Sequence, residues 1–374
     1  MKRFINAVLK FLALICAGLL VVVLPLALTL YNGGEVMFSR QVLENITTTV
    51  MVDSEFTPGA LEFITNQRAE EISRGMEEEQ KGEDLNLFFL IEGMDIEDWR
   101  NIHQELLTDE ILGGWIRTTY AGVFDWLDTE EQLPEIQWDM QPLIERMQGP
   151  AGERVVNTFY NSLPDCTDLE MEEMQTAEGD PLPKAQMVQY LCKLSTFPHQ
   201  DQITVYREVF QLAIERVPPA YDFTQGVIIG QSGGLKPLAA KRQLRAYRRN
   251  TDLALLLPLG LLFSILVLGV RSLTGLGQWW GIPLTGGSLI AFLTSLLFRP
   301  LWTGLLSENM PEVVPATSVL YHELISGSAL LVSRVFSPLR WQSFLLLLVG
   351  LGLVAMGFLV QLGGEKAEEA PPEQ

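Results

Sequence analysis

Three histidines are the first residues to consider for chemistry in this 374-residue chain. His103, His199 and His322 lie far apart in the sequence. None falls in HExxH, in the GxSxG turn of a nucleophilic serine, or in the phosphate-binding pattern GxxxxGK[ST]. Acidic pairs are so abundant that their presence singles out no catalytic pair. The sequence therefore predicts no catalytic residues and no cofactor, as expected of a protein that is not an enzyme.

The densest set of possible metal ligands is the acidic segment DCTDLEMEEMQTAEGD, which begins at Asp165. Carboxylate oxygens are the ligands that Ca²⁺ prefers, so a cation site is one interpretation of this segment. Its spacing differs from that of an EF-hand loop, and it lacks the central glycine of that loop. We therefore expect a solvated acidic loop, and we predict no metal site.

Long apolar blocks predict a membrane protein. Hydrophobic residues make up 48% of the chain, and the mean hydropathy is positive. The block from Phe11 to Leu30 contains no charge, and at about 1.5 Å per residue it can cross a hydrocarbon core of about 30 Å. Similar blocks cover residues 253–270, 281–298 and 344–362. The predicted fold is a mainly α-helical transmembrane protein with four spans.

The first block is either a cleaved secretory signal or an uncleaved anchor. Basic residues within the first ten positions fit both interpretations. The apolar stretch is longer than the roughly 7 to 15 residues of a signal core, and no convincing small-x-small cleavage site follows it. Cys16 would suit a lipoprotein site, but Ile15 precedes it where a small residue is needed. We expect a signal-anchor span over residues 1–30.

The basic N-terminus sets the expected orientation. Under the positive-inside rule it lies in the cytoplasm, so residues 31–250 form an exported, acidic domain. Residues 251–362 form a three-span membrane domain with an external segment at 300–340. Within that segment, residues 316–336 lie either flat in the interface or inserted between spans. Residues 363–374 have the composition of a disordered tail and lie in the cytoplasm.

Five cations before the second span conflict with this orientation. They are Lys241, Arg242, Arg245, Arg248 and Arg249. The positive-inside rule is weakest here, because a long exported loop translocates largely regardless of its charge. We predict a basic membrane collar that snorkels to the headgroups, with a specific lipid or ligand site as the alternative. Nucleic acid is not an expected partner, because residues 31–240 hold 38 acidic and 13 basic residues and would repel phosphates.

The exported region has the apolar spacing of helices and is long enough to bury a core. Thr57 with Pro58 marks one helix start. Thr108, followed by two acidic residues, is placed to cap a second helix. A third helix ends before Pro218, and the stretch EIQWDM from Glu135 is predicted to be extended. The exported domain is therefore expected to be mostly helical.

Cys166 and Cys192 lie in this exported region. An even number of cysteines in an oxidising compartment predicts one disulfide. It would close a loop of about 26 residues and contribute about 3 kcal/mol in the chain-entropy model. Metal binding is the weaker alternative, because no CxxC pair or clustered histidine accompanies these cysteines.

The turn between the second and third spans, RSLTGLGQWWGIP, contains Trp279 and Trp280. Tryptophan is enriched at the headgroup level, so both are predicted interfacial anchors. Small residues in the third span, such as Gly286, Gly287 and Ser288, would permit close helix packing. No Asp, Glu, Lys or His lies deep in a predicted span, which argues against a transporter.

The layout resembles that of a group of uncharacterised bacterial four-span membrane proteins. The resemblance covers nearly the whole chain: one N-terminal span, an exported helical domain with two cysteines, and a span ending in VRSL before WWGIPL. Its local marks are residues 270–284 and the pair Cys166 and Cys192. The resemblance implies no particular activity.

Two classes of function fit these patterns. The first is a non-enzymatic integral protein of the cell membrane, inner or plasma, whose acidic exported domain binds a protein partner or a ligand. The second is a membrane-embedded enzyme or transport component whose site forms only in three dimensions. The lack of motifs and of charge within the spans favours the first class. A buried cluster of carboxylates with a histidine in one exported cleft would favour the second. The bilayer is the one partner that composition implies, and the oligomeric state stays open.

Overall fold

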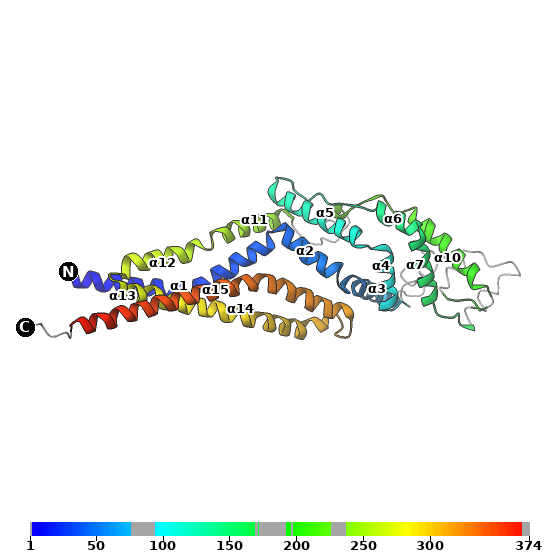
Figure 1. The fold of residues 1–374 in the computed structure, drawn as a ribbon. Helices are drawn as coiled ribbons and strands as arrows, with labels where there is room; N and C mark the ends of the chain where they lie inside the picture. Colours follow the sequence, from blue (N-terminus) through cyan, green and yellow to red (C-terminus); the bar gives the residue numbers. More distant parts are fainter. Residues whose placement is uncertain are drawn as a thin grey trace, which may run out of the picture. The chain divides into compact units, whose positions relative to one another are not determined.

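The computed structural model describes residues 2–75, 94–168, 171, 192–195, 197–225 and 237–368. These residues are mainly α-helical, with one small two-stranded sheet (Figure 1). Four helical stretches are long and apolar enough to cross a membrane: Asn6–Met37, Pro237–Gly269, Thr274–Asn309 and Val319–Gln361. The predicted fold class, a mainly helical protein with four membrane spans, is confirmed.

Contacts within the chain separate two compact units. The first, which we call the membrane unit, comprises Met1–Leu43, Lys236–Glu308 and Ser328–Gln374. The second, which we call the acidic unit, comprises Glu44–Leu235 and Asn309–Gly327. The domain boundaries expected at residues 30 and 250 fall inside helices. Part of the expected external segment packs with the acidic unit, where Leu320 and Tyr321 are buried against Phe56 and Phe63.

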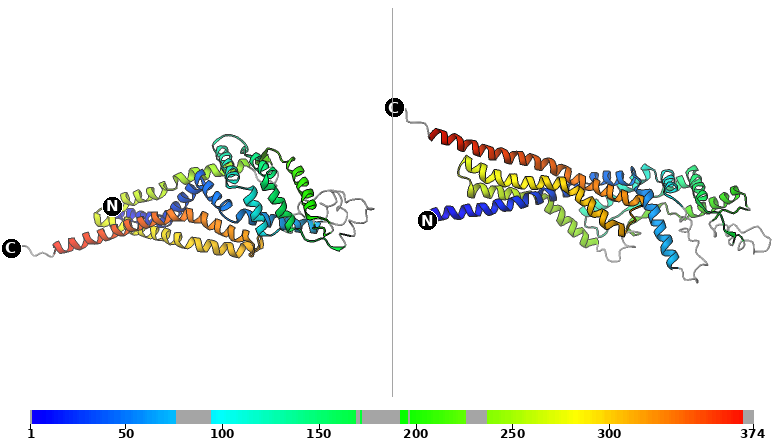
Figure 2. Two further views of the ribbon diagram at one scale, coloured as in Figure 1. Left: turned by 45° about the vertical axis from the view of Figure 1, so that its right-hand side comes forward. Right: turned by 90° about the horizontal axis from the view of Figure 1, so that it is seen from below.

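The membrane unit is built from helices that run alongside one another (Figures 1 and 2). They are α1 (Lys2–Met37), α11 (Pro237–Leu253), α12 (Leu256–Gly269), α13 (Leu273–Leu276), the π-helix η3 (Gly277–Gly281), α14 (Ile282–Asn309) and α15 (Val319–Glu368). Leu20, Ile265, Ala291 and Leu339 come from four of these helices and are fully buried in one apolar cluster. Many other leucines on these helices are exposed, as expected of side chains that face lipid.

Small residues bring the third and fourth spans into backbone contact. A Cβ added at Gly277 would lie 2.5 Å from the carbonyl oxygen of Leu353 and 2.8 Å from the Cα of Gly357. A Cβ added at Gly281 would lie 2.9 Å from the backbone nitrogen of Val354. Any side chain at these two positions would push η3 away from α15, so the glycines set the spacing of the helices.

Helix α15 continues without a break from Val319 to Glu368. Residues 319–336 therefore lead directly into the fourth span and do not form a separate helix. The helix also passes position 362, where the sequence predicts the start of a disordered tail, and residues 369–374 lie outside the described residues. Apart from the turn that contains Pro338, which has no N–H to donate, the continuous helix supplies partners for the backbone groups along this apolar stretch.

One polar pair joins the first and fourth spans. Asn32 Nδ2 donates to Gln342 Oε1 at 2.7 Å, and Gln342 Nε2 donates to Asn32 Oδ1 at 3.2 Å. Asn32 is buried, and its Nδ2 also donates to the carbonyl of Leu28. Such interhelical amide bonds give the buried Asn32 side chain the hydrogen-bond partners that water cannot supply in an apolar bundle.

The acidic unit consists of short helices and one two-stranded sheet. They are α2 (Arg40–Met51, which begins in the membrane unit), α3 (Phe56–Gly75), α4 (Ile96–Leu106), α5 (Asp109–Asp128), β1 (Gln137–Asp139), α6 (Gln141–Gln148), α7 (Pro150–Ser162), α10 (His199–Ile214), β2 (Ala220–Asp222), the 3₁₀ helix η4 (Met310–Glu312) and the start of α15. The predicted extended stretch is confirmed as β1, which pairs antiparallel with β2 and sets Trp138 opposite Tyr221.

Local signals explain where these helices begin. Asp95 caps α4, because its Oδ1 accepts from the backbone nitrogens of Glu97 and Asp98, and the Asp98 side chain completes a capping box. Helix α5 begins at Asp109, as predicted, but the Thr108 side chain makes no capping hydrogen bond. The carbonyl of Thr108 instead accepts the backbone N–H groups of Ile111 and Leu112.

Cys166 and Cys192 form a disulfide, as predicted. Cys192 is buried in a cluster with Val156 and Tyr160 of α7. The chain around the bridge is also held by the buried Gln202 side chain, which bonds both the backbone nitrogen and the carbonyl of Leu194. Most of the acidic segment between the two cysteines lies outside the described residues.

Candidate functional site

A polar cleft of about 870 Å³ opens in the acidic unit. It lies at the turn between α2 and α3, against α4, the start of α5, α6 and the first turns of α15. Its ionisable residues are Asp53, Glu55, Arg100, His103, Asp109, Glu110, Arg146 and Glu323. We call it the His103 cleft. Its volume lies within the range of about 300–1,000 Å³ that is typical of ligand pockets.

His103 is the most deeply placed of these groups. The side chain is 8% exposed, and its Nε2 atom is buried without a hydrogen-bond partner in the described part of the chain. Burial lowers the pKa of His103, while the charges of Glu55 and Asp109 act less strongly in the opposite direction. The imidazole is therefore neutral near pH 7. A buried polar atom without a partner costs about 1–3 kcal/mol, which a ligand group or a water in the cleft would offset.

Two arginines on the cleft wall are oriented by their Nε atoms. Arg100 Nε contacts both carboxylate oxygens of Glu55, at 2.9 and 3.0 Å. Arg146 Nε donates to the backbone carbonyl of Glu105 at 2.8 Å. Among the described residues, the terminal guanidinium nitrogens of Arg100 and Arg146 have no hydrogen-bond partner. Each arginine therefore keeps donors available for an acceptor in the cleft.

Carboxylates dominate the rest of the cleft. Asp109 and Glu110 occupy the first turn of α5, where the helix dipole favours negative charge. Asp53 is exposed and Glu323 is half-buried. The Arg100–Glu55 pair neutralises one carboxylate, so four carboxylates remain against the single guanidinium of Arg146. The cleft therefore has a net negative charge at neutral pH.

The cleft has the composition of a catalytic site but lacks its internal bonds. Among the described residues, no hydrogen bond links the His103 ring to a carboxylate, and the Ser54 hydroxyl donates to the carbonyl of Val50. A histidine that acts as a base for a nucleophile needs an orienting group and a nucleophile within hydrogen-bond reach. No three His, Cys, Asp or Glu residues of the described ranges lie close enough to hold a metal.

The five predicted collar residues lie on α11 in different environments. Lys241 is only 4% exposed, whereas Arg242, Arg248 and Arg249 are exposed and Arg245 is half-buried. Helix α11 packs on the end of α1, where the rings of Tyr247 and Phe38 lie 5.8 Å apart. The exposed arginines are open to solvent, whereas the buried Lys241 is not. The collar as a whole stays a prediction.

The two predicted interfacial tryptophans lie in η3 and are half-buried. Trp280 Nε1 donates to the carbonyl of Leu262 at 3.0 Å, which ties η3 to α12. The Trp279 ring lies against Gly269, where an added Cβ would be 3.0 Å away. Both rings therefore hold the turn between the second and third spans together, a role that composition alone did not indicate. Their position relative to the headgroups stays a prediction.

The His103 cleft was not predicted from the sequence. Its residues come from four separate stretches, near positions 53, 105, 146 and 323, and no motif links them. One signal was available: His103 lies on the apolar face of α4 with Trp99 and Leu106, which are also buried. A histidine on such a face is more often a core residue than a ligand, so the signal is weak.

No protein-family model matches the chain, and neither does any curated protein or solved structure. The class that the fold defines is a multi-span membrane protein with four candidate spanning helices. Of the layout noted in the sequence, the structure shows the four long apolar helices.

Burial of a neutral histidine predicts acid sensitivity. The unfolded chain binds a proton on His103 near its ordinary pKa of about 6.5, whereas the folded chain binds it only at lower pH. The contribution of His103 to the free energy of unfolding should therefore be constant above about pH 6.5, and it should fall as the pH drops below that value. Chemical denaturation of the full-length protein at pH 7.5 and 5.5 would measure this loss.

The comparison of His103→Gln with His322→Gln isolates the effect, because His322 is exposed. We expect His103→Gln to reduce the pH dependence and His322→Gln to leave it unchanged. Burial raises the pKa values of Glu62 and Asp98, which would change stability with the opposite sign. Both groups are present in every variant and cancel in the comparison. Equal pH dependence in the wild type and His103→Gln would rule out this role of His103.

Proposed function

We propose that the chain is a non-enzymatic, membrane-anchored binding protein whose acidic unit lies outside the cytoplasmic membrane and binds a small amine-bearing ligand in the His103 cleft. The observation that carries the proposal is the buried His103 Nε2 atom without a described partner, at the wall of a cleft with net negative charge. The ligand supplies a hydrogen-bonding group to His103 and positive charge to the surrounding carboxylates.

Charge decides the class of ligand. Asp53, Asp109, Glu110 and Glu323 contribute four carboxylates that the Arg100–Glu55 pair does not neutralise. Ammonium groups match such a surface, and electrostatic attraction speeds their association. The free donors of Arg146 accommodate a carbonyl or carboxylate on the same molecule. A short basic peptide has this combination of groups, and a nucleotide or an acidic peptide does not.

The disulfide supports the proposed location of the acidic unit. Disulfides persist in oxidising compartments and are rare in the cytosol. Export of the acidic unit requires the N-terminus of the first span to face the cytoplasm, which agrees with its basic residues. Helix α1 then serves as an uncleaved anchor, and both chain termini lie in the cytoplasm.

A membrane-embedded enzyme or transport component is the alternative. The cluster of acids and a histidine in one cleft has the composition that such a site needs. A catalytic role would require a carboxylate to orient His103, and Glu55 is instead engaged by Arg100. Transport would require ionisable side chains within the apolar blocks of the spans, where the sequence has no Asp, Glu, Lys or His. Binding is the function that these observations favour.

Calorimetric titration of the full-length protein in nanodiscs with trilysine tests the proposal. We expect trilysine to bind and triglutamate not to bind. The double variant Asp109→Asn, Glu110→Gln should weaken trilysine binding about tenfold, because each exposed charge pair contributes up to about 1 kcal/mol. The effect should shrink at high salt.

The matched control removes two exposed charges from the other end of the same helix. The control variant is Asp125→Asn, Asp128→Asn, and its two residues lie about 24 Å further along α5, at about 1.5 Å per residue. This variant should leave trilysine binding unchanged. Equal losses in both double variants would mean that overall charge, and not the cleft, attracts the peptide. Binding of triglutamate as tight as that of trilysine would refute the proposed ligand class.

A further inference from the structure

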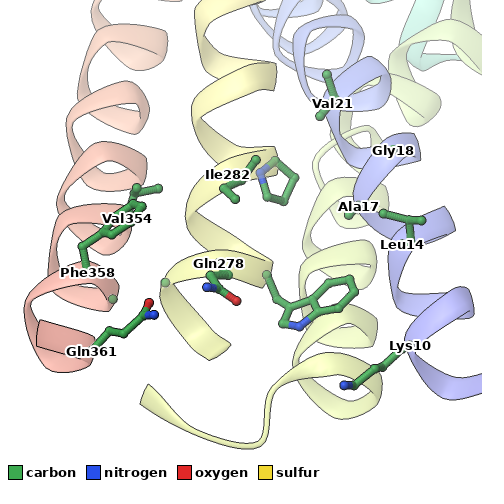
Figure 3. A pocket seen from close by; sticks show the side chains of 14 residues that line it. Lys10, Leu14, Ala17, Gly18, Val21, Gln278, Ile282, Val354, Phe358 and Gln361 are labelled. Carbon is green, nitrogen blue, oxygen red and sulfur yellow. The ribbon is translucent and has the colours of Figure 1, made fainter. Parts of the chain in front are cut away.

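The membrane unit contains a groove of about 570 Å³ between α1 and α15 (Figure 3). Its floor is the end of η3 and the first turn of α14. The side of the groove formed by α1 is open, because Gly18 faces the groove and an added Cβ there would meet nothing within 4 Å. The tight contact of Gly277 with α15 closes the floor, so the open space lies on the side of α1.

The walls of the groove are apolar over most of their length. Leu14 projects from α1, Ile282 from α14, and Phe358 from α15, and these three side chains enclose the same space (Figure 3). Each of the three is at least 60% exposed, so no protein side chain of the described residues covers them. In a bilayer this space is filled by hydrocarbon, because water would find no hydrogen-bond partners among such apolar side chains.

One end of the groove is polar. Lys10, Gln278 and Gln361 gather there, whereas Gly18 and Val21 lie toward the other end (Figure 3). All three polar residues stand at the border of an apolar block: Lys10 precedes Phe11, Gln278 precedes the third block, and Gln361 lies at the end of the fourth. They therefore lie at one headgroup level of the membrane. Among the described residues that line the groove, Lys10 is the one charged group, and none is acidic.

We propose that this groove binds one glycerophospholipid with an anionic headgroup. An acyl chain lies along Leu14, Ile282 and Phe358, and the phosphate lies on the ammonium group of Lys10. The side-chain amides of Gln278 and Gln361 donate to phosphate or glycerol oxygens. Basic pockets between spanning helices at the headgroup level bind anionic lipids for the same reasons: charge at one end and hydrocarbon at the other. The proposal is independent of the ligand proposed for the His103 cleft and of the orientation of the chain.

Native mass spectrometry of the full-length protein, released from nanodiscs of phosphatidylglycerol and phosphatidylcholine in equal amounts, tests this site. The wild type should retain one phosphatidylglycerol in preference to phosphatidylcholine. Lys10→Gln should reduce that preference about fivefold, as expected for one cation near a lipid phosphate. Arg271→Gln removes an exposed cation from the turn after α12, outside the groove, and should leave the preference unchanged.

A second pair of variants tests the acyl-chain part of the groove. Gly18→Leu should fill the open space and abolish lipid retention. Gly260→Leu on α12 has equally open surroundings outside the groove and should retain the lipid. Deacylated glycerophosphoglycerol and inorganic phosphate should not displace the bound lipid, because neither fills the apolar walls.

Four results would overturn the proposal. The first is equal retention of the two lipids by the wild type. The second is displacement of the lipid by free phosphate, which would make the site an anion site. The third is an unchanged lipid preference in Lys10→Gln. This substitution replaces an exposed side chain and leaves the helix packing intact. Its result therefore does not depend on whether Gly18→Leu folds. Retention of phosphatidylglycerol by a folded Gly18→Leu would likewise place the lipid elsewhere.

Discussion

Alkaline phosphatase fused after residue 150 should be active in a bacterial host, and a fluorescent protein fused after residue 374 should fluoresce in the cytoplasm. The basic residues before the first span favour a cytoplasmic N-terminus, and the disulfide between Cys166 and Cys192 favours an oxidising compartment for the acidic unit. With four spans, the N- and C-termini lie on the same side. The expected effect is all or none, because each reporter works on one side of the membrane.

The same experiment decides which part of the chain controls insertion. Arg249, Arg299 and Arg340 border the second, third and fourth apolar blocks on the side opposite to Lys10. Counted alone, these arginines would hold that side in the cytoplasm. We expect the first span to prevail because it enters the membrane first. Exchanging the two reporters is the control, and both should then be silent. An inactive phosphatase at residue 150 would place the acidic unit in the cytoplasm and overturn the proposed location.

Replacing both bridged cysteines, Cys166→Ser with Cys192→Ser, should destabilise the acidic unit by about 3 kcal/mol. The bridge closes a loop of 26 residues and so restricts the unfolded chain. Part of the folded arrangement should survive, because Lys193 also bonds the backbone of Pro164 and Cys166, and Gln202 holds Leu194. Chemical denaturation of the full-length protein, followed by tryptophan fluorescence, would measure the change in the free energy of unfolding.

Alkylation followed by mass spectrometry checks the bridge itself. Without reductant, Cys16 should be the cysteine that reacts once the protein is denatured, and all three should react after reduction. Cys16→Ser is the matched control, because this cysteine lies in α1 and forms no bridge. It should leave the stability of the acidic unit unchanged. Full alkylation of Cys166 and Cys192 in unreduced protein would contradict the disulfide.

The sequence by itself determined the features that depend on neighbouring residues. Four uncharged apolar blocks predict four spans, because a charge at the centre of a bilayer is costly and every backbone group there needs a partner. The extended stretch predicted at residues 135–140 contains β1 (Gln137–Asp139) and follows from local composition. The pairing of Cys166 with Cys192 followed from parity, since no other cysteine lies in that region.

The tertiary structure alone decided which distant residues meet. Glu55, Arg100 and Glu323 line one cleft although they lie far apart in the chain, and no periodic pattern encodes that meeting. The same is true of Lys10, Gln278 and Gln361, which meet at one end of the groove. Tertiary packing also decides that Lys241 is buried, although the other predicted collar residues lie on the same helix. Local patterns reflect hydrogen bonds and hydrophobic faces within a few residues of one another. Clefts depend on how whole helices pack. Residues without a side chain, such as Gly18 and Gly277, set that packing and leave no signal in the composition.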